Sequence, residues 1–352
     1  MKTLLAFFAV IFLAIPASAE TKLKMGALLP LSGEVANIGE ACRNGMELAK
    51  SNLEPEIAKK LDLIFEDDAL LSKTSVSAFN KLVTEDKIDL AVSFSSGTSK
   101  ALAPIADSKN IPLIAIASDK GVVEGRQNVV TLWVTPEVQA QLLIKEIQNR
   151  GYKKIAIVSA THDATEAFLS EFNKANQGIV EVALSEEFLT QARDFKPFIG
   201  KIKAKKDIDA IFVNLFFGQP GTFAKQVREL GLDIDFFGVE VFEEKSEIEA
   251  SKGALIGAWY IQADDGKDNF IKRYSNQYQD ATTYTAANCY DAVFLAAEWI
   301  KQDMSPTKFV TYLKTLKDFD GALGTYSATG DNRFTLPAVI KVVEKDGFRK
   351  LY

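Results

Sequence analysis

Two short polar turns hold residues of this sequence that suit the binding of a small anion. Residues 95–99 form a hydroxyl-rich turn between a predicted strand, Leu90–Phe94, and a predicted helix at residues 99–109. Residues 117–119 follow the next predicted strand, at residues 112–116. Both turns should therefore lie at the ligand-binding edge of a parallel sheet, where free N–H groups of the helix suit a carboxylate or phosphate. The predicted contacts are Ser95, Ser96, Ser99, Ala117, Ser118 and Asp119.

The second half of the chain repeats this arrangement. Residues 206–209 (KDID) precede a predicted strand in the same way that residues 86–89 (DKID) precede Leu90–Phe94. The turn after that second strand contains Phe217, which fits either a cleft-lining or a core position, as does its neighbour Phe216. Glu240 ends a further predicted strand. The two halves should therefore present matching turns to a shared cleft.

Catalysis and metal binding have little support in the sequence. His162 is the only histidine, so a histidine metal cluster is excluded and a Ser-His-Asp triad has a single candidate. It follows a strand near the expected cleft, but without an obvious nucleophile an exposed loop histidine is the favoured interpretation. Glu66, Asp67 and Asp68 lack the spacing of a cation-binding loop, which favours a solvated turn. We therefore expect no enzyme activity, no cofactor and no metal.

The order of predicted elements is strand, helix, strand, helix almost throughout, which is typical of α/β folds. A helix opens at residues 135–137 with a threonine cap and a proline, runs to Arg150 and stops at Gly151. A strand at residues 154–158 then restarts the alternation, as a second lobe would. In the first lobe we predict strands at residues 23–29, 61–65, 90–94, 112–116 and 129–134, and helices at residues 39–51, 73–85 and 99–109.

The last part of the chain combines helices with a hairpin. Helices are predicted at residues 269–280 and 284–301, and the hairpin turns at residues 345–347. Because no flexible linker separates the lobes, we expect several short crossings between them. The predicted division is residues 20–134 with 263–330 in one lobe, and residues 135–262 with 331–352 in the other.

Residues 1–19 are typical of a signal peptide. They contain one lysine, an apolar run of 12 residues that is too short to span a bilayer, and a small-residue cleavage site. The remaining chain should therefore be soluble and exported to the periplasm. The full sequence of 352 residues carries a formal net charge of −6 without a clustered basic face, which argues against nucleic acid as a partner.

The two cysteines lie on apolar helical stripes. Cys42 shares its stripe with Ile38 and Ala49, and Cys289 shares one with Ala286 and Ala296. Buried free thiols are favoured over a Cys42–Cys289 bridge, because the sequence does not supply the geometry that a bridge requires.

Five motifs, in this order, resemble the leucine/isoleucine/valine-binding protein family, the type I periplasmic binding proteins of ABC importers. The resemblance covers essentially the whole chain after the predicted signal peptide. It implies two Rossmann-like lobes with parallel sheets, joined by a hinge of three crossings and closing on a small ligand without catalysis. The motifs are GALLPLSGEVANIGEACRNGMELA (residues 26–49), SSGTSKALAPIADSKNIPLIAIAS (95–118), FFGVE (236–240), YTAANCYDAVFLAAEWI (284–300) and LGTYSATGDNRF (323–334).

The resemblance also implies roles for individual residues. Ser96 matches the position that binds the ligand carboxylate, and Ala117 matches the one whose carbonyl accepts from the ammonium. Glu240 matches the acid that pairs with the ammonium. Positions that contact the ligand side chain correspond to Ile38, Phe94 and Phe217.

Two positions depart from the family pattern. Asp119 stands where a threonine is usual, which would place a second carboxylate near the ligand ammonium and favour polar or basic ligands. Ala164 or Thr165 stands where many members have a tyrosine, which would enlarge the pocket.

Three functional hypotheses follow. The leading one is a monomeric periplasmic receptor that binds an amino acid or related small zwitterion and delivers it to an ABC importer. The alternative is a ligand-sensing or scaffold protein of the same fold that regulates an envelope partner. An exported enzyme is supported by His162 alone.

Overall fold

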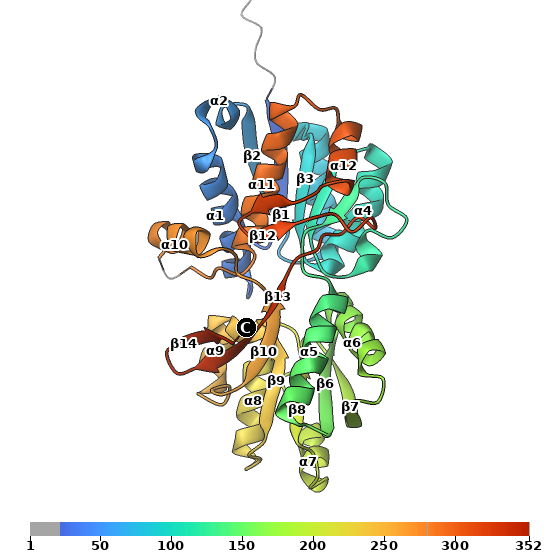
Figure 1. Ribbon diagram of the computed structural model, residues 1–352, viewed down its shortest axis with the longest axis vertical. Coiled ribbons are helices and arrows are strands. Elements are labelled where there is room, and N and C mark those ends of the chain that lie inside the picture. Colours follow the sequence, from blue (N-terminus) through green and yellow to red (C-terminus); the bar gives the residue numbers. More distant parts are fainter. Residues whose placement is uncertain (1–21, 280, 352) are drawn as a thin grey trace, which may run out of the picture.

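A computed structural model describes residues 22–279 and 281–351, so the predicted signal peptide at residues 1–19 lies outside the described residues. Two lobes lie one beyond the other along the longest axis of the molecule, and the chain passes between them more than once (Figure 1). Each lobe is an α/β unit built on its own sheet. The predicted two-lobed α/β fold is thus confirmed. In the described part of the chain, no helix is both long and apolar enough to cross a membrane.

The first lobe contains a parallel sheet with the strand order β2-β1-β3-β4-β5 among the described residues. Every residue of the central strand β3 is buried, as expected for an apolar strand covered by helices on both faces. The strands are β1 (Leu23–Leu29), β2 (Leu61–Asp67), β3 (Leu90–Phe94), β4 (Leu113–Ile116) and β5 (Val129–Thr131).

Helices from both ends of the chain cover this sheet. The predicted helix at residues 73–85 is divided, because its last part, Leu82–Asp86, winds as a π-helical turn before Lys87 adopts a left-handed conformation. A small two-stranded sheet, β11 (Phe319–Gly321) with β12 (Gly324–Tyr326), also belongs here. The helices are α1 (Ala36–Asn52), α2 (Pro55–Ala58), α3 (Ser72–Lys81), α4 (Ser96–Lys109), α10 (Asp268–Gln277), α11 (Ala286–Lys301) and α12 (Pro306–Lys314).

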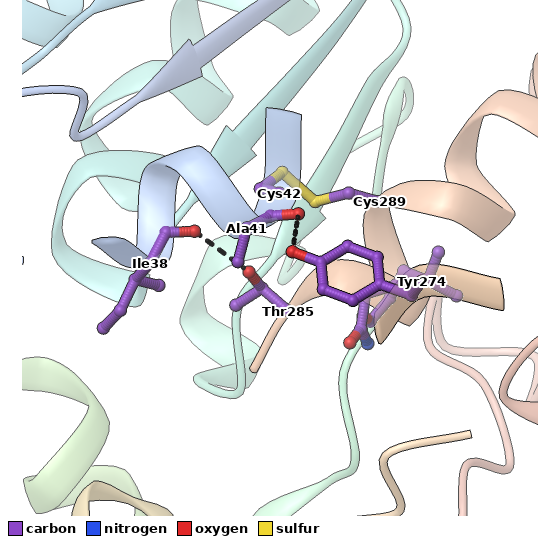
Figure 2. Close-up of a disulfide and its surroundings, with 8 residues drawn as sticks. Ile38, Ala41, Cys42, Tyr274, Thr285 and Cys289 are labelled. Carbon is purple, nitrogen blue, oxygen red and sulfur yellow. Dashed lines mark hydrogen bonds between the residues drawn. A yellow bond between two sulfur atoms is a disulfide. The ribbon is translucent and has the colours of Figure 1, made fainter. Parts of the chain in front are cut away.

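A disulfide between Cys42 and Cys289 joins α1 to α11 (Figure 2). The expectation of free thiols is therefore wrong. The two helices approach closely because Gly45 has no side chain: a Cβ there would lie 2.2 Å from the carbonyl oxygen of Ala286. The cysteines are 247 residues apart in sequence, so this contact arises from helix packing that no local pattern shows.

Two side-chain hydrogen bonds accompany the disulfide. The Tyr274 hydroxyl donates to the carbonyl oxygen of Ala41 at 3.4 Å, and the Thr285 hydroxyl donates to that of Ile38 at 3.3 Å. Figure 2 shows both bonds beside the sulfur atoms. The first bond ties α10 to α1, and the second ties the residue just before α11 to α1.

The second lobe contains a mixed sheet with the strand order β14-β13-β10-β9-β8-β6-β7 among the described residues. Strands β6 to β10 are parallel to one another. Strands β13 and β14 form the predicted terminal hairpin, and β13 pairs antiparallel with β10. The strands are β6 (Lys154–Thr161), β7 (Glu181–Leu189), β8 (Ala210–Asn214), β9 (Asp235–Val239), β10 (Trp259–Ala263), β13 (Ala338–Glu344) and β14 (Gly347–Lys350).

Aromatic side chains fill much of the core on one face of this second sheet. The rings of Phe212 and Phe237 stack with centroids 5.2 Å apart, and Phe237 stacks on Trp259 at 4.8 Å. Such large buried rings contribute strongly to the stability of a core. The helices that cover the sheet are α5 (Pro136–Arg150), α6 (Asp163–Asn176), α7 (Lys196–Ala204), α8 (Pro220–Glu229) and α9 (Lys245–Ser251).

The chain crosses between the lobes at residues 132–135, 264–267 and 327–337 of the described part. The last crossing leads into β13, which runs toward the second lobe in Figure 1. Main-chain hydrogen bonds join neighbouring crossings, as from the N–H of Asp264 to the carbonyl oxygen of Pro337 at 3.2 Å. The carboxyl ends of β3, β4, β8 and β9, from both sheets, face the space between the lobes.

Candidate ligand-binding site

A cavity lies between the lobes, at the carboxyl ends of the parallel strands. It encloses about 640 Å³ of empty space, part of which is open to solvent. Its lining residues come from both lobes and from the segments that join them. They are Phe94, Ser95, Ser96, Ile116, Ala117, Ser118, Trp133, Gln139, His162, Ala164, Thr165, Phe168, Asn214, Leu215, Phe216, Phe217, Val239, Glu240, Val241 and Tyr284.

The start of α4 supplies hydrogen-bond donors to the first-lobe wall. The first main-chain hydrogen bond of this helix runs from the N–H of Ser99 to the carbonyl oxygen of Ser95, at 3.0 Å. The N–H groups of Ser96, Gly97 and Thr98 therefore precede the intrahelical ladder and remain available to an anion. Ser95 itself has φ 75°, a left-handed conformation that turns the chain sharply from β3 into α4.

The Ser96 hydroxyl is oriented by the neighbouring turn. Its oxygen accepts from the N–H of Asp119 at 3.2 Å, which leaves its own proton free to donate. Both predicted turns thus lie side by side, with Ala117 and Ser118 also in the cavity wall.

Three residues predicted from the sequence do not line the cavity. Ile38 is fully buried in the first-lobe core, where its carbonyl oxygen accepts from Thr285. Ser99 is also buried and shares a 2.7 Å hydrogen bond with the Ser93 hydroxyl. Asp119 likewise lies outside the cavity lining.

The carboxylate of Asp119 is turned toward its own turn and toward Lys100. It accepts from the N–H of Gly121 at 2.8 Å and from Lys100 Nζ at 3.1 Å. These partners explain why this acid does not add negative charge to the cavity wall. The second carboxylate that the sequence placed near the ligand is therefore absent from the lining.

Glu240 supplies the acidic group of the second-lobe wall. Gln139 Nε2 and the Tyr284 hydroxyl donate to its two carboxylate oxygens, each at 3.4 Å. Burial raises the pKa of Glu240 to about 7, above its ordinary value of 4.5. No Lys or Arg forms an ion pair with Glu240 in the part of the chain that the structure describes. A cationic group of a ligand would therefore find an uncompensated acid here.

Tyr284 joins the aromatic residues of the two lobes. Its ring centroid lies 5.3 Å from that of Trp133 and 6.5 Å from that of Phe94, both in the first-lobe wall. The ring of Phe217, in the second lobe, lies 6.3 Å away. The predicted cleft position of Phe217 agrees with its place in the lining, and Phe216 lies there as well. These rings form the aromatic part of the apolar surface of the cavity.

His162 lines the cavity and is not an exposed loop residue, so that sequence interpretation is wrong. Its ring stacks on Phe216, with centroids 4.1 Å apart, and its Nδ1 accepts from the N–H of Ala164 at 3.2 Å. Burial lowers its pKa. Ala164 and Thr165, the positions without the usual tyrosine, also lie in the wall.

Several lining residues were missed by the sequence reasoning. Asn214 and Val239 end strands that were predicted, so the strand-end rule could have found them. Gln139 lies one turn inside α5. Trp133 falls in the predicted strand at residues 129–134, and Tyr284 begins the predicted helix at residues 284–301. In the structure β5 ends at Thr131 and α11 begins at Ala286, so both residues lie in irregular segments, which the sequence pattern did not show.

The acidic turn after β2 has a structural role. Asp68 is fully buried and accepts from the Ser75 hydroxyl at 2.8 Å and from the N–H of Leu70 at 2.9 Å. Asp67 accepts from the N–H groups of Leu31 and Ala69, both at 2.9 Å. The expectation of a solvated turn therefore holds for Asp67, which is exposed, and is wrong for Asp68. No cluster of side chains that could hold a metal ion occurs among the described residues.

The lobes also touch outside the cavity. Lys100 Nζ lies 2.9 Å from Asp163 Oδ1, and Asn37 Nδ2 donates to Glu244 Oε2 at 2.6 Å. The lobes are therefore drawn together in a closed arrangement, although part of the cavity remains open to solvent.

The chain matches known proteins over most of its length. A family model described as periplasmic binding protein matches residues 22–347. The Leu/Ile/Val-binding protein BraC3 of Rhizobium johnstonii is 24% identical over an alignment of 361 positions, gaps included, that covers 94% of each chain. The Leu/Ile/Val-binding protein homolog 3 of Brucella melitensis is 26% identical over an alignment of 351 positions, which covers 93% of this chain and 92% of that protein.

Solved structures share the fold. The branched-chain amino acid transporter substrate binding protein LivJ of Streptococcus pneumoniae, in complex with isoleucine, has a TM-score of 0.84 and 22% identity, covering 94% of this chain and all of the other. A solute binding protein of an ABC transporter from R. palustris, in complex with 4-hydroxybenzoate, has a TM-score of 0.84 and 18% identity, covering 92% and 93%. The chain therefore belongs to the periplasmic binding protein family and is related to the Leu/Ile/Val-binding proteins, as its sequence motifs predict.

Proposed function

We propose that this protein is a periplasmic receptor that captures an amino acid or a related small zwitterion between its lobes and delivers it to an ABC importer. The single observation that carries the proposal is the pairing of unlike polar groups in one cavity. The start of α4 offers N–H donors and the Ser96 hydroxyl, whereas Glu240 offers an acid without a cationic partner among the described residues.

This arrangement suits a carboxylate and an ammonium on the same molecule. The carboxylate would accept from the α4 N–H groups, and the ammonium would donate to Glu240 and to the carbonyl oxygen of Ala117. The rings of Tyr284 and Phe217 would cover the apolar part of the ligand. Enclosure by both lobes would strengthen the charged contacts by excluding water.

An aromatic carboxylate is a second candidate, and the ring-rich wall favours it. Because the pKa of Glu240 is about 7, its carboxyl group can be neutral near neutral pH. In that form it would accept from a ligand hydroxyl without needing a cation. A sensing or scaffold protein in the cell envelope is the remaining alternative, and it requires no high-affinity transport ligand.

A thermal-shift screen of the exported chain would test these candidates. The probes are the common L-amino acids, benzoate and 4-hydroxybenzoate, because a ligand that prefers the native state raises the melting temperature. For any amino acid that stabilises the protein, calorimetry would compare it with its amide and with its deaminated acid.

The proposal expects both analogues to bind at least tenfold more weakly than the amino acid itself. If the deaminated acid or a benzoate binds as tightly as the amino acid does, the ligand is a simple or aromatic carboxylate and the zwitterion proposal is wrong. If no probe stabilises the protein, the scaffold alternative is favoured.

A further inference from the structure

The starts of two helices approach each other across the cleft. Gly97 lies in the first turn of α4, and a Cβ on it would lie 3.6 Å from both His162 Nε2 and Asp163 Oδ2. His162 caps the N-terminus of α6 in the second lobe. Helix N-termini carry partial positive charge, so the corner formed by α4 and α6 favours an anion from both sides.

The backbone and ring of His162 are held firmly in this corner. Its carbonyl oxygen accepts from the Thr165 hydroxyl at 2.8 Å and from the N–H of Glu166 at 2.9 Å. The ring stacks on Phe216, and both rings line the cavity. His162 therefore needs little reorganisation to bind a ligand, which limits the entropy lost on binding.

The hydrogen bond to Nδ1 decides which ring nitrogen carries the proton. Because Nδ1 accepts from the N–H of Ala164, the neutral ring must carry its proton on Nε2. Among the described residues, none accepts a hydrogen bond from this Nε2–H, and the atom is accessible to solvent in the cavity wall. It is thus a spare donor beside the first turn of α4.

The charged groups around this corner leave the donor free. Asp163, the nearest acid, is paired with Lys100, which also binds Asp119. Glu240 is held instead by Gln139 and Tyr284.

We propose that His162 is the second lobe's ligand for the carboxylate of the bound molecule, to which it donates from Nε2. The inference rests on the proposed function, because it needs a carboxylate at the start of α4. The first lobe then holds this carboxylate through the α4 N–H groups and Ser96, and the second lobe holds it through His162. A ligand whose carboxylate is contacted by both lobes would favour the closed arrangement.

Two pairs of probes isolate the carboxylate: L-isoleucine with L-isoleucinamide, and 4-hydroxybenzoate with 4-hydroxybenzamide. His162→Phe keeps a ring to stack on Phe216 but removes the donor, and His162→Gln restores an N–H. Thr161→Ala, at the exposed end of β6, is the matched control. Calorimetry would measure the affinities, and melting temperatures without probe would verify that each variant is folded.

The expected result is that His162→Phe lowers affinity for the carboxylate by about 10- to 100-fold. Affinity for the matching carboxamide should fall much less, so that the preference for the carboxylate shrinks. His162→Gln should recover part of the loss, and Thr161→Ala should behave like the wild type. A purely structural role of His162 would lower both affinities alike.

Because the chain has one histidine, ¹⁵N-histidine labelling of the wild type gives an independent readout. Nε2 should be the protonated nitrogen without ligand, and its NMR signal should move when the carboxylate probe is added. Wild-type affinity in His162→Phe, or an unmoved Nε2 signal with bound probe, would overturn the inference and leave the proposed function intact. If none of the amino acids and benzoates in the thermal-shift screen binds the wild type, the proposed function fails and this inference fails with it.

Discussion

The hydroxyl of Tyr284 donates to Oε1 of Glu240 at 3.4 Å and so connects the segment before α11 in the first lobe with the end of β9 in the second. The bond is long, and Gln139 is no closer on the other oxygen. Glu240 is thus positioned in the cavity by two weak donors and has room for a stronger one. A ligand ammonium would supply it.

Replacing Glu240 tests its role as the anchor for that ammonium. Glu240→Gln keeps the shape of the side chain but removes the counter-charge, so we expect affinity for a zwitterionic ligand to fall by about 2 to 5 kcal/mol. Calorimetry with the ligand found in the screen would measure the loss. Glu54→Gln, which changes an exposed acid far from the cavity, serves as the control. A loss below about threefold, or roughly 0.7 kcal/mol, would show that Glu240 is not the anchor.

The pH dependence of stability should also change in Glu240→Gln. The folded-state pKa of about 7 lies above the ordinary value of 4.5, so between these values the folded protein binds more protons than the unfolded chain. Each rise in pH through this range therefore lowers the free energy of unfolding, by at most about 3 kcal/mol in total. Glu240→Gln has no titrating group at this position, so its free energy of unfolding should not fall in this way. The difference in unfolding free energy, variant minus wild type, should therefore rise from pH 5 to pH 8. Urea unfolding without ligand would measure it, and a pH-independent difference would contradict it.

The hydroxyl of Tyr284 should contribute modestly to ligand binding. Tyr284→Phe keeps the ring contacts with Trp133 and Phe217 but removes the donor to Glu240, so we expect an affinity loss of about 0.5 to 1.5 kcal/mol. Tyr284→Ala also removes the ring and should lose considerably more. Calorimetry on both variants separates the two contributions. Equal losses would mean that the ring contributes nothing.

The disulfide should stabilise the first lobe. Replacing Cys42 and Cys289 together by alanine should lower the free energy of unfolding by about 2 to 5 kcal/mol, measured by urea unfolding. In the wild type, alkylation of the denatured protein without a reductant should modify neither cysteine, as checked by intact mass. Two modified thiols would contradict the bridge.

Asp119 should have little influence on ligand choice. Because its carboxylate is bound to Lys100 and Gly121 and does not line the cavity, Asp119→Asn should change the affinity for a given ligand by less than about threefold. It should also leave the ratio between basic and apolar amino acids unchanged. A large drop confined to basic ligands would restore the role that the sequence predicted for this acid.

The carboxyl-end turns could be predicted from the sequence because strand and helix patterns are local. Short apolar runs such as Leu90–Phe94 mark strands buried on both faces, and the residues that follow such strands must lie at one edge of a sheet. Ser96 and Glu240 were found in this way, strengthened by ordered family motifs, and both line the cavity.

Tertiary packing alone decided which distant residues meet. The contact between α1 and α11, allowed by the small Gly45, brings Cys42 to Cys289, and it also fixes the segment that carries Tyr284. A periodic pattern records which face of an element is buried, but it carries no information about which element covers that face.

The directions of polar side chains were likewise decided in three dimensions. Asp119 turns to Lys100 because α4 places that cation beside it, and His162 faces the cavity because its Nδ1 caps α6 while its ring stacks on Phe216. Each of these polar groups forms a hydrogen bond with a partner that the fold brings close to it, and the neighbouring sequence does not reveal which partner that is.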